Sequence, residues 1–128
     1  MAAYYYKYRV LSKDFVDGYL FQQPLKTRDT MSLRYQIIPV TPFEQNCTLL
    51  WCDETMEGTL IDAGGDTAKL MAAVSKNHVK VTKLLLTHGH LDHVGAAQQM
   101  ATHYQVKIEG PQKEEQFWLD MLPQQAMM

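Results

Sequence analysis

The sequence lacks the features typical of membrane proteins, secreted proteins and nucleic-acid-binding proteins. No run of apolar residues approaches the ~18 that a membrane span requires. The first ten residues are rich in tyrosine and contain no apolar signal core. The formal net charge of −2 provides no general attraction to nucleic acid or to an acidic membrane. We therefore expect a cytoplasmic protein with no nucleic-acid partner and no membrane partner.

Cysteine is also scarce, since the 128 residues include only Cys47 and Cys52. Five positions apart on one strand, their side chains would point to opposite faces, so we expect no disulfide between them. Their spacing does not match a zinc knuckle either, and we expect two buried or half-buried thiols. The remaining composition, 46% apolar and 20% charged, is typical of one modest globular domain.

What the sequence does contain is a dense group of side chains that can bind metal. His88, His90, Asp92 and His93 fall within six positions. The apolar run 84–86 just before them indicates a buried strand, and apolar residues at helical spacing follow them. The group is therefore predicted to lie where the chain leaves a strand and enters a helix. Open α/β sheets bind ligands at this end of their strands.

The spacing of these four residues suggests how they could share metal ions. In an extended chain, side chains at i and i+2 point the same way, so we expect His88 and His90 to reach one ion together. Gly89 between them adds no side chain that would crowd the ion. Asp92 either caps the first helical turn or turns toward a second ion, and His93 is expected to point elsewhere. Imidazole and carboxylate ligands suit zinc, and also iron or manganese.

From residue 31 onward the hydrophobic pattern predicts alternating strands and helices. Strands are expected at 34–40, 46–52, 59–61, 81–87 and 106–108. The second and third should form an antiparallel hairpin. The order strand, helix, strand between residues 60 and 86 predicts a βαβ unit with parallel strands.

Three helices are expected within this pattern. The first follows Asp66, a good N-cap residue, and His78 is assigned to its apolar face. The second is expected as one helix over 92–104. The third should begin at Gly110-Pro111, because proline suits the first helical position. Its predicted core-facing stripe consists of Phe117, Trp118, Met121 and Leu122.

These residues resemble a known family. The run His88-x-His90-x-Asp92-His93 resembles the H-x-H-x-D-H signature of the metallo-β-lactamase fold superfamily. The stretches 37–47, 61–66 and 85–90 are similar to its type II glyoxalase-like (hydroxyacylglutathione hydrolase-like) branch. The resemblance runs from about Met31 to the C-terminus and covers the first half of that family's domain. It implies an α/β fold, the N-terminal half of an αββα sandwich, with a mixed sheet and flanking helices.

The resemblance also implies roles for individual residues. His88 and His90 would hold one zinc ion, and Asp92 and His93 a second, in a complete domain that binds two. Asp62 would lie beside the metal-binding turn and brace it as an outer hydrogen-bond acceptor; the alternative is an ordinary turn aspartate at a strand end. Asp92 is the candidate catalytic residue, because it could also orient the attacking hydroxide. Two further histidines and a bridging aspartate are expected beyond residue 128.

The implied activity is hydrolysis of a small-molecule thioester, such as an S-acylglutathione, by a metal-bound hydroxide. A lactonase, β-lactamase or phosphodiesterase on the same fold is an alternative, since fold does not determine substrate. Because part of the ligand set is expected outside this chain, we expect impaired activity. Two alternatives of a different class are an inactive truncated remnant and a metal-binding or interaction module that completes its site in trans.

The predicted domain organisation is an extension over residues 1–30 and a truncated domain over residues 31–128. The extension does not resemble the family. Its tyrosines, interleaved with Lys7 and Arg9, could stack on nucleic-acid bases, but a loosely held segment is favoured because basic residues are few. With one sheet of the sandwich present, an apolar face would lack a partner. We therefore expect self-association through the exposed half-sandwich, aggregation or partial disorder.

Overall fold

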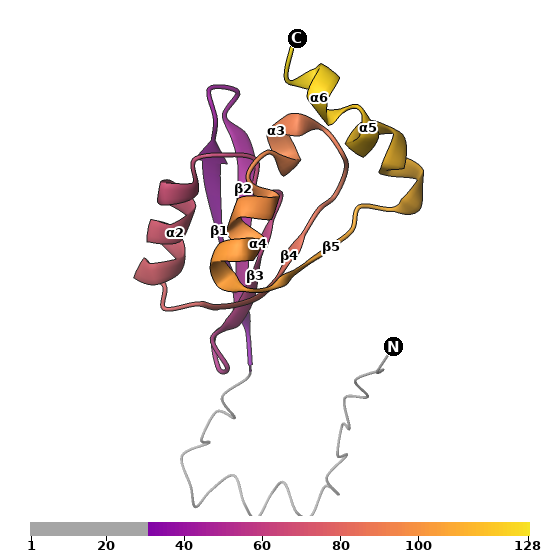
Figure 1. The fold of residues 1–128 in the computed structure, drawn as a ribbon. Helices are drawn as coiled ribbons and strands as arrows, with labels where there is room; N and C mark the ends of the chain where they lie inside the picture. Colours follow the sequence, from indigo (N-terminus) through magenta and orange to yellow (C-terminus); the bar gives the residue numbers. More distant parts are fainter. Residues whose placement is uncertain (1–30) are drawn as a thin grey trace, which may run out of the picture. The chain divides into compact units, whose positions relative to one another are not determined.

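A computed structural model describes residues 31–128, which form one mixed five-stranded sheet (Figure 1). The strands are β1 (Leu33–Val40), β2 (Gln45–Cys52), β3 (Glu57–Ile61), β4 (Lys80–Leu85) and β5 (Lys107–Glu109). They lie in sheet order β1-β2-β3-β4-β5. The pairs β1–β2 and β2–β3 are antiparallel, and the pairs β3–β4 and β4–β5 are parallel. The predicted hairpin and βαβ unit are therefore confirmed. The predicted extension, residues 1–30, lies outside the described residues, and its boundary stays a prediction.

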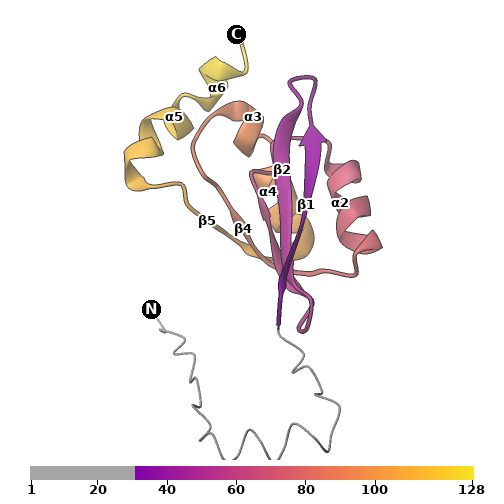
Figure 2. The same ribbon diagram turned by 180° about the vertical axis from the view of Figure 1, so that it is seen from behind.

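The helices within residues 31–128 are short. They are α2 (Thr67–Lys76), α3 (Leu91–Val94), α4 (Ala97–Tyr104), the 3-10 turn η1 (Lys113–Glu115), α5 (Gln116–Asp120) and α6 (Leu122–Gln125). Helices α2 and α4 lie on the same face of the sheet, while α3, α5 and α6 gather beyond one end of its strands (Figures 1 and 2). Among the described helices, none combines the length and the apolar character needed to cross a bilayer.

The core lies between the sheet and its two covering helices. Cys47 and Leu49 are two positions apart on β2, so they lie on the same face of the sheet, and both are fully buried. This is expected for a strand with one face on a core. Leu70 of α2 and Met100 of α4 are also fully buried. Both cysteines are free, with Cys47 buried and Cys52 half-buried, so both predictions about the thiols are confirmed.

The opposite face of the sheet carries apolar side chains that remain exposed. Leu33, Tyr35 and Ile37 occupy every second position of β1 and are 71%, 68% and 51% exposed. Figure 2 shows β1 and β2 from this side, with α2 and α4 behind them. Within residues 31–128, no helix covers this face, which agrees with a half-sandwich.

The single helix predicted over 92–104 is wrong, because the chain forms α3 and α4 with a break at Gly95 and Ala96. The Ala96 N–H donates to the Ala63 carbonyl oxygen at 2.9 Å, outside the helix. The loop after β3 therefore takes the hydrogen bond that would have continued α3, and the helix ends.

Two residues assigned to α2 behave differently from the prediction. Asp66 occupies the N-cap position, but its side chain makes no capping bond and accepts from the Thr41 N–H at 2.9 Å. His78 is not on the apolar face, because α2 ends at Lys76 and His78 is exposed with φ of 55°. In both cases a contact or a turn outside the helix decides the conformation.

The prediction for the last helix is also wrong in two respects. It does not begin at Gly110-Pro111, since Gly110 has φ of 85°, outside the helical range, and helical structure starts with η1. The apolar stripe is not core, because Phe117 and Trp118 are 62% and 39% exposed. The turn η1 and helices α5 and α6 lie beside the loop that follows β4 rather than on the sheet. Their apolar side chains therefore do not join the core between the sheet, α2 and α4.

Candidate metal site

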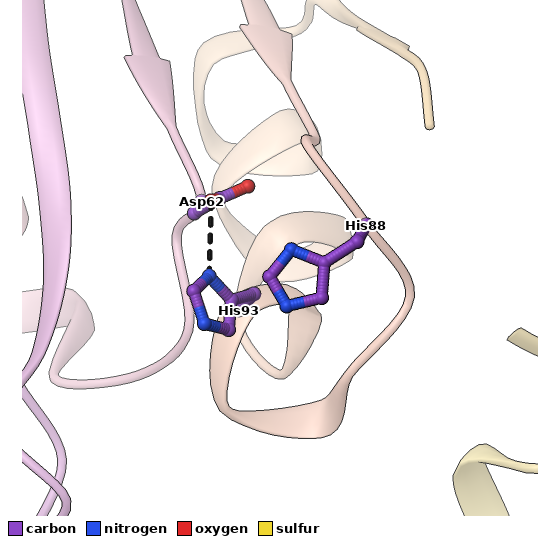
Figure 3. Close-up of side chains that lie close together, drawn as sticks. All are labelled: Asp62, His88 and His93. Carbon is purple, nitrogen blue, oxygen red and sulfur yellow. Dashed lines mark hydrogen bonds and ion pairs between the residues drawn. The ribbon is translucent and has the colours of Figure 1, made fainter. Parts of the chain in front are cut away.

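The candidate site forms where two neighbouring parallel strands end. Asp62 follows β3 directly, and residues 86–90 after β4 form a loop that we call the histidine loop. Because β3 and β4 pair side by side, their carboxyl ends bring the two segments together. One ligand atom each from Asp62, His88 and His93 lies within 4.8 Å of the others (Figure 3). At this spacing, one small cation could be bound by all three side chains or by some of them.

Asp62 is buried and accepts three hydrogen bonds. Its Oδ1 accepts from the Thr87 N–H at 2.8 Å, and its Oδ2 from the Thr87 hydroxyl at 2.6 Å. Oδ2 also lies 2.9 Å from Nδ1 of His93. Asp62 thus lies beside the histidine loop and contacts it through Thr87, while its role as a brace for metal ligands stays a prediction.

The same hydrogen bonds define which imidazole nitrogens are free. The Thr87 hydroxyl donates to Asp62 and therefore accepts from Nδ1–H of His88, 2.8 Å away. Nδ1 of His93 lies 2.9 Å from Oδ2 of Asp62 and 3.0 Å from Nε2 of Gln45. Because a carboxylate oxygen accepts, we assign the proton to Nδ1 of His93, which then donates to Asp62. Nε2 then carries the lone pair in both rings and is the nitrogen that could bind a metal ion. The donor set of two imidazoles beside a carboxylate fits a zinc, iron or manganese ion.

Asp92 does not cap α3, although it lies in its first turn. Its Oδ2 lies 3.6 Å from Nε2 of His93. The carboxylate thus faces the nitrogen that the Asp62 contact leaves free. Of the two alternatives for Asp92, the helix cap is therefore wrong, and its role as a metal ligand stays a prediction.

The relative directions of the histidines differ from the expectation based on extended chain. The ring centroids of His88 and His93 are 4.0 Å apart, so His93 does not point away from His88. One turn of α3 returns the chain toward the loop and brings His93 back beside His88. The His90 ring lies 4.7 Å from His88 and 4.6 Å from Trp118, edge-on to both. His90 is adjacent to the group but is not one of its three members.

The glycines around the site are required by close backbone approach. A Cβ on Gly64 would lie 1.7 Å from the Asp92 carbonyl oxygen, so the loop after β3 packs directly on α3. A Cβ on Gly89 would lie 2.7 Å from Cβ of Trp118. Gly89 therefore makes room for α5, and the expectation that it also leaves space for a metal ion stays a prediction.

Four residues at the site were not identified from the sequence. Thr87 links Asp62 to His88, and Nε2 of Gln45 lies 3.0 Å from Nδ1 of His93. Gln125 and Glu115 hydrogen-bond the backbone of the histidine loop. Thr87 adjoins the histidines and Gln45 lies within the 37–47 stretch, so both had a local signal. The other two had none, because they contact the loop from 26 to 36 positions away.

An open hollow of about 1060 Å³ adjoins the site. Its lining includes His90 and Asp92 from the candidate ligands, Phe43 from the β1–β2 turn, and Trp118 and Gln125 from the C-terminal helices. Aromatic and polar side chains in one concave surface are typical of small-molecule sites. The hollow therefore offers room for a ligand next to His90 and Asp92.

The charge of Asp62 also acts on Cys47 in the core behind it. Burial, and then the nearby Asp62 carboxylate, raise the pKa of the Cys47 thiol to about 12. A thiol in this state is neutral at physiological pH and a poor metal ligand. Cys47 is therefore a packing residue rather than a member of the candidate site.

Comparisons with known proteins agree with this geometry. A family model described as the metallo-beta-lactamase superfamily matches residues 40–127. The hydroxyacylglutathione hydrolase GloC of Haemophilus influenzae is 45% identical over 94 residues, which are 73% of this chain and 44% of that protein. The BLEG-1 B3 metallo-beta-lactamase structure matches with a TM-score of 0.60 and 26% identity, over 66% of this chain and 40% of that one.

A second solved structure, TTHA1623 in a di-iron-bound form, matches with a TM-score of 0.52 and 29% identity, over 57% of this chain and 36% of that one. The chain thus spans less than half the length of each of these relatives. The match over residues 40–127, together with the sheet and the histidine loop, leads to one conclusion: the chain belongs to the metallo-beta-lactamase superfamily.

Proposed function

We propose that the chain supplies part of a metal-dependent hydrolase that cleaves small-molecule thioesters of the S-acylglutathione class. The observation that carries the proposal is the convergence of Asp62, His88 and His93, whose ligand atoms lie within 4.8 Å of one another. The similarity to a hydroxyacylglutathione hydrolase over 94 residues supports the substrate class. The activity is a proposal because the chain spans 44% of that relative.

The metal set that we propose is a pair of zinc ions, with iron or manganese as alternatives. His88 and His90 would hold one ion, and Asp92 and His93 the other. Zinc sites commonly have four ligands, so each ion needs ligands beyond these. Within residues 31–128 the structure gathers no second group of three His, Cys, Asp or Glu side chains. The remaining ligands would therefore come from outside this part of the chain or from another chain.

The proposed reaction assigns distinct tasks to the residues of the site. Bound metal ions of this kind lower the pKa of water toward ~7 and polarise a carbonyl. Asp62 and Thr87 hold the rings of His88 and His93 in one tautomer. Asp92, the proposed catalytic residue, accepts a hydrogen bond from the attacking water and orients it toward the carbonyl carbon. The C–S bond then breaks, giving a carboxylic acid and a thiol.

The hollow beside the histidine loop is the proposed substrate site. It reaches both His90 and Asp92, so a thioester carbonyl could approach the side chains that we assign to the metal ions. Phe43 and Trp118 provide apolar wall, which suits an acyl group better than a highly charged one.

The test is metal content per chain, measured by elemental mass spectrometry after gel filtration of protein loaded with zinc. We expect bound zinc in the wild-type chain and at least a tenfold loss of affinity in His88→Ala and Asp92→Ala. His103→Ala is the matched control, because His103 is an exposed histidine of α4. Because each ion needs further ligands, we expect impaired turnover by the loaded protein, with an S-acylglutathione cleaved in preference to a lactone or a phosphodiester.

The other outcomes distinguish the alternatives. Turnover of a lactone, a β-lactam or a phosphodiester without thioester turnover would replace the substrate class. Zinc binding without turnover would favour a metal-binding or interaction module. Absence of zinc from the wild-type chain would contradict the proposal and favour an inactive remnant.

A further inference from the structure

We infer that Glu115, Trp118 and Gln125 form a clamp that holds the histidine loop in shape, with Gln125 as its central positioning residue. These residues lie in η1, α5 and α6, beyond the strands that carry the site. The inferred benefit to metal binding rests on the proposed function. The clamp itself rests on contacts among the described residues.

Gln125 uses its whole side-chain amide to hold the backbone on either side of His90. Its Oε1 accepts from the Leu91 N–H at 2.9 Å. Its Nε2 donates to the carbonyl oxygens of Gly89 at 3.3 Å and Trp118 at 2.9 Å. The acceptor and both donor hydrogens of the amide are therefore engaged. One side chain thus ties α5 to both neighbours of His90.

Glu115 and Trp118 complete the hold on Gly89. Oε2 of Glu115 accepts from the Gly89 N–H at 3.1 Å, so both backbone polar groups of Gly89 bond to clamp side chains. Trp118 packs so closely on Gly89 that a Cβ added to this glycine would lie 2.7 Å from Cβ of Trp118. The Trp118 ring also lies edge-on to His90, with the centroids 4.6 Å apart.

The histidine loop needs such partners because it belongs to no helix or strand. Backbone polar groups outside regular structure require other hydrogen-bond partners when they are shielded from water. The N–H groups of residues 87, 89 and 91 are bound by Asp62, Glu115 and Gln125 respectively. The backbone is thus held at residues 87, 89 and 91, on either side of His88 and of His90.

The exposure of α5 and α6 indicates that core packing does not hold them in place. Neither α5 nor α6 contains a buried residue, so hydrophobic burial contributes little to their position. Their contacts with the histidine loop are mainly polar, and polar contacts orient groups more than they add stability. We therefore expect loss of Gln125 to loosen the loop without unfolding the sheet.

The experiment compares amide hydrogen exchange in the wild-type chain, Gln125→Ala and Gln124→Ala. Gln124 is the exposed neighbour of Gln125 in α6 and is the matched control. We expect the Leu91 amide to exchange at least tenfold faster in Gln125→Ala and unchanged in Gln124→Ala. Amides of β2 and β3 should keep wild-type rates in both. Gln125→Glu retains an acceptor and should restore protection at Leu91 but not the bonds to Gly89 and Trp118.

The second measurement is zinc affinity by competition with a chelator. Residues that support metal ligands commonly change affinity by 10–100-fold when replaced. We expect a loss of that size in Gln125→Ala, a partial loss in Gln125→Glu and no change in Gln124→Ala, with similar melting temperatures. Equal Leu91 exchange in wild type and Gln125→Ala would overturn the clamp. Absence of zinc from the wild-type chain would count against the proposed hydrolase, while the exchange rates still decide the clamp.

Discussion

At the scale of single residues, Asp62 acts on several of its neighbours. It adopts φ of 59°, a left-handed conformation that aspartate tolerates better than most residues. This turn directs its carboxylate toward Thr87 and His93. The same charge, added to burial, raises the pKa of Cys47. One side chain therefore orients a candidate ligand and adds to the burial that keeps a nearby thiol neutral.

The two cysteines should consequently differ in reactivity. A pKa of about 12 for Cys47 leaves roughly one thiolate in ten thousand at pH 8. The Thr55 N–H beside Cys52 Sγ lowers the pKa of that thiol, and Cys52 is more accessible. We expect iodoacetamide at pH 8 to alkylate Cys52 at least tenfold faster than Cys47, as measured by peptide mass spectrometry.

Cys52→Ser provides the control for this labelling. It should remove the fast reaction in the native chain, whereas both thiols of the wild-type chain should react in denaturant. Fast native alkylation of Cys47 would show that the core behind Asp62 is open to solvent, contrary to its burial.

At the scale of elements, the position of α3 depends on the loop between β3 and α2. The Ala63 carbonyl oxygen accepts from Ala96 N–H at 2.9 Å, and Gly64 lies directly against the Asp92 carbonyl. These contacts end α3 after four residues. They also set the position of the helical turn that carries Asp92 and His93.

Gly64→Ala should therefore be strongly destabilising. The added Cβ would lie 1.7 Å from a backbone oxygen, and no side-chain rotation can relieve that overlap. We expect a loss of about 3 kcal/mol in the free energy of unfolding, the upper part of the range for overpacking. Urea unfolding followed by circular dichroism measures this loss.

Gly65→Ala is the matched control for this substitution. Its Cβ would meet only the Thr41 methyl group, at 2.6 Å, and that side chain can rotate. We expect less than about 1 kcal/mol, because the neighbour can give way. Equal unfolding midpoints for the two variants would contradict the inferred contact between Gly64 and α3.

At the larger scale of the described residues, the two faces of the sheet differ in whether helices cover them. Helices α2 and α4 cover one face, and no described helix covers the other (Figure 2). Strand register places Tyr35 opposite Leu50 and Ile37 opposite Thr48 on that second face. Contiguous exposed apolar surface of this kind favours association.

We therefore expect the 128-residue chain to self-associate through this face. Sedimentation velocity should show a sedimentation coefficient that rises with protein concentration. Full burial of a large apolar side chain contributes about 1.5–3 kcal/mol, so Tyr35→Lys with Ile37→Lys should weaken association at least tenfold. Phe43→Ser is the control, because Phe43 is 80% exposed in the β1–β2 turn rather than on the sheet face. A concentration-independent monomer would contradict this expectation.

The sequence alone was sufficient for the features that depend on local pattern. Alternating burial along β2 was predictable because a strand repeats every two residues. The position of His88, His90, Asp92 and His93 at a strand end followed from the apolar run before them and the helical spacing after them. The parallel pairing of β3 and β4 followed from the helix between them.

Only the tertiary structure decided how these elements meet. The break between α3 and α4 arises from a hydrogen bond to Ala63, 33 positions from Ala96, and no local pattern encodes that partner. The pairing of His93 with His88 depends on where one turn of α3 returns. The role of Gly89 depends on Trp118, which the helical pattern assigned to the core. The residue types that can bind metal were thus readable in the sequence. Their orientation was not, because it depends on backbone contacts between segments that are distant along the chain.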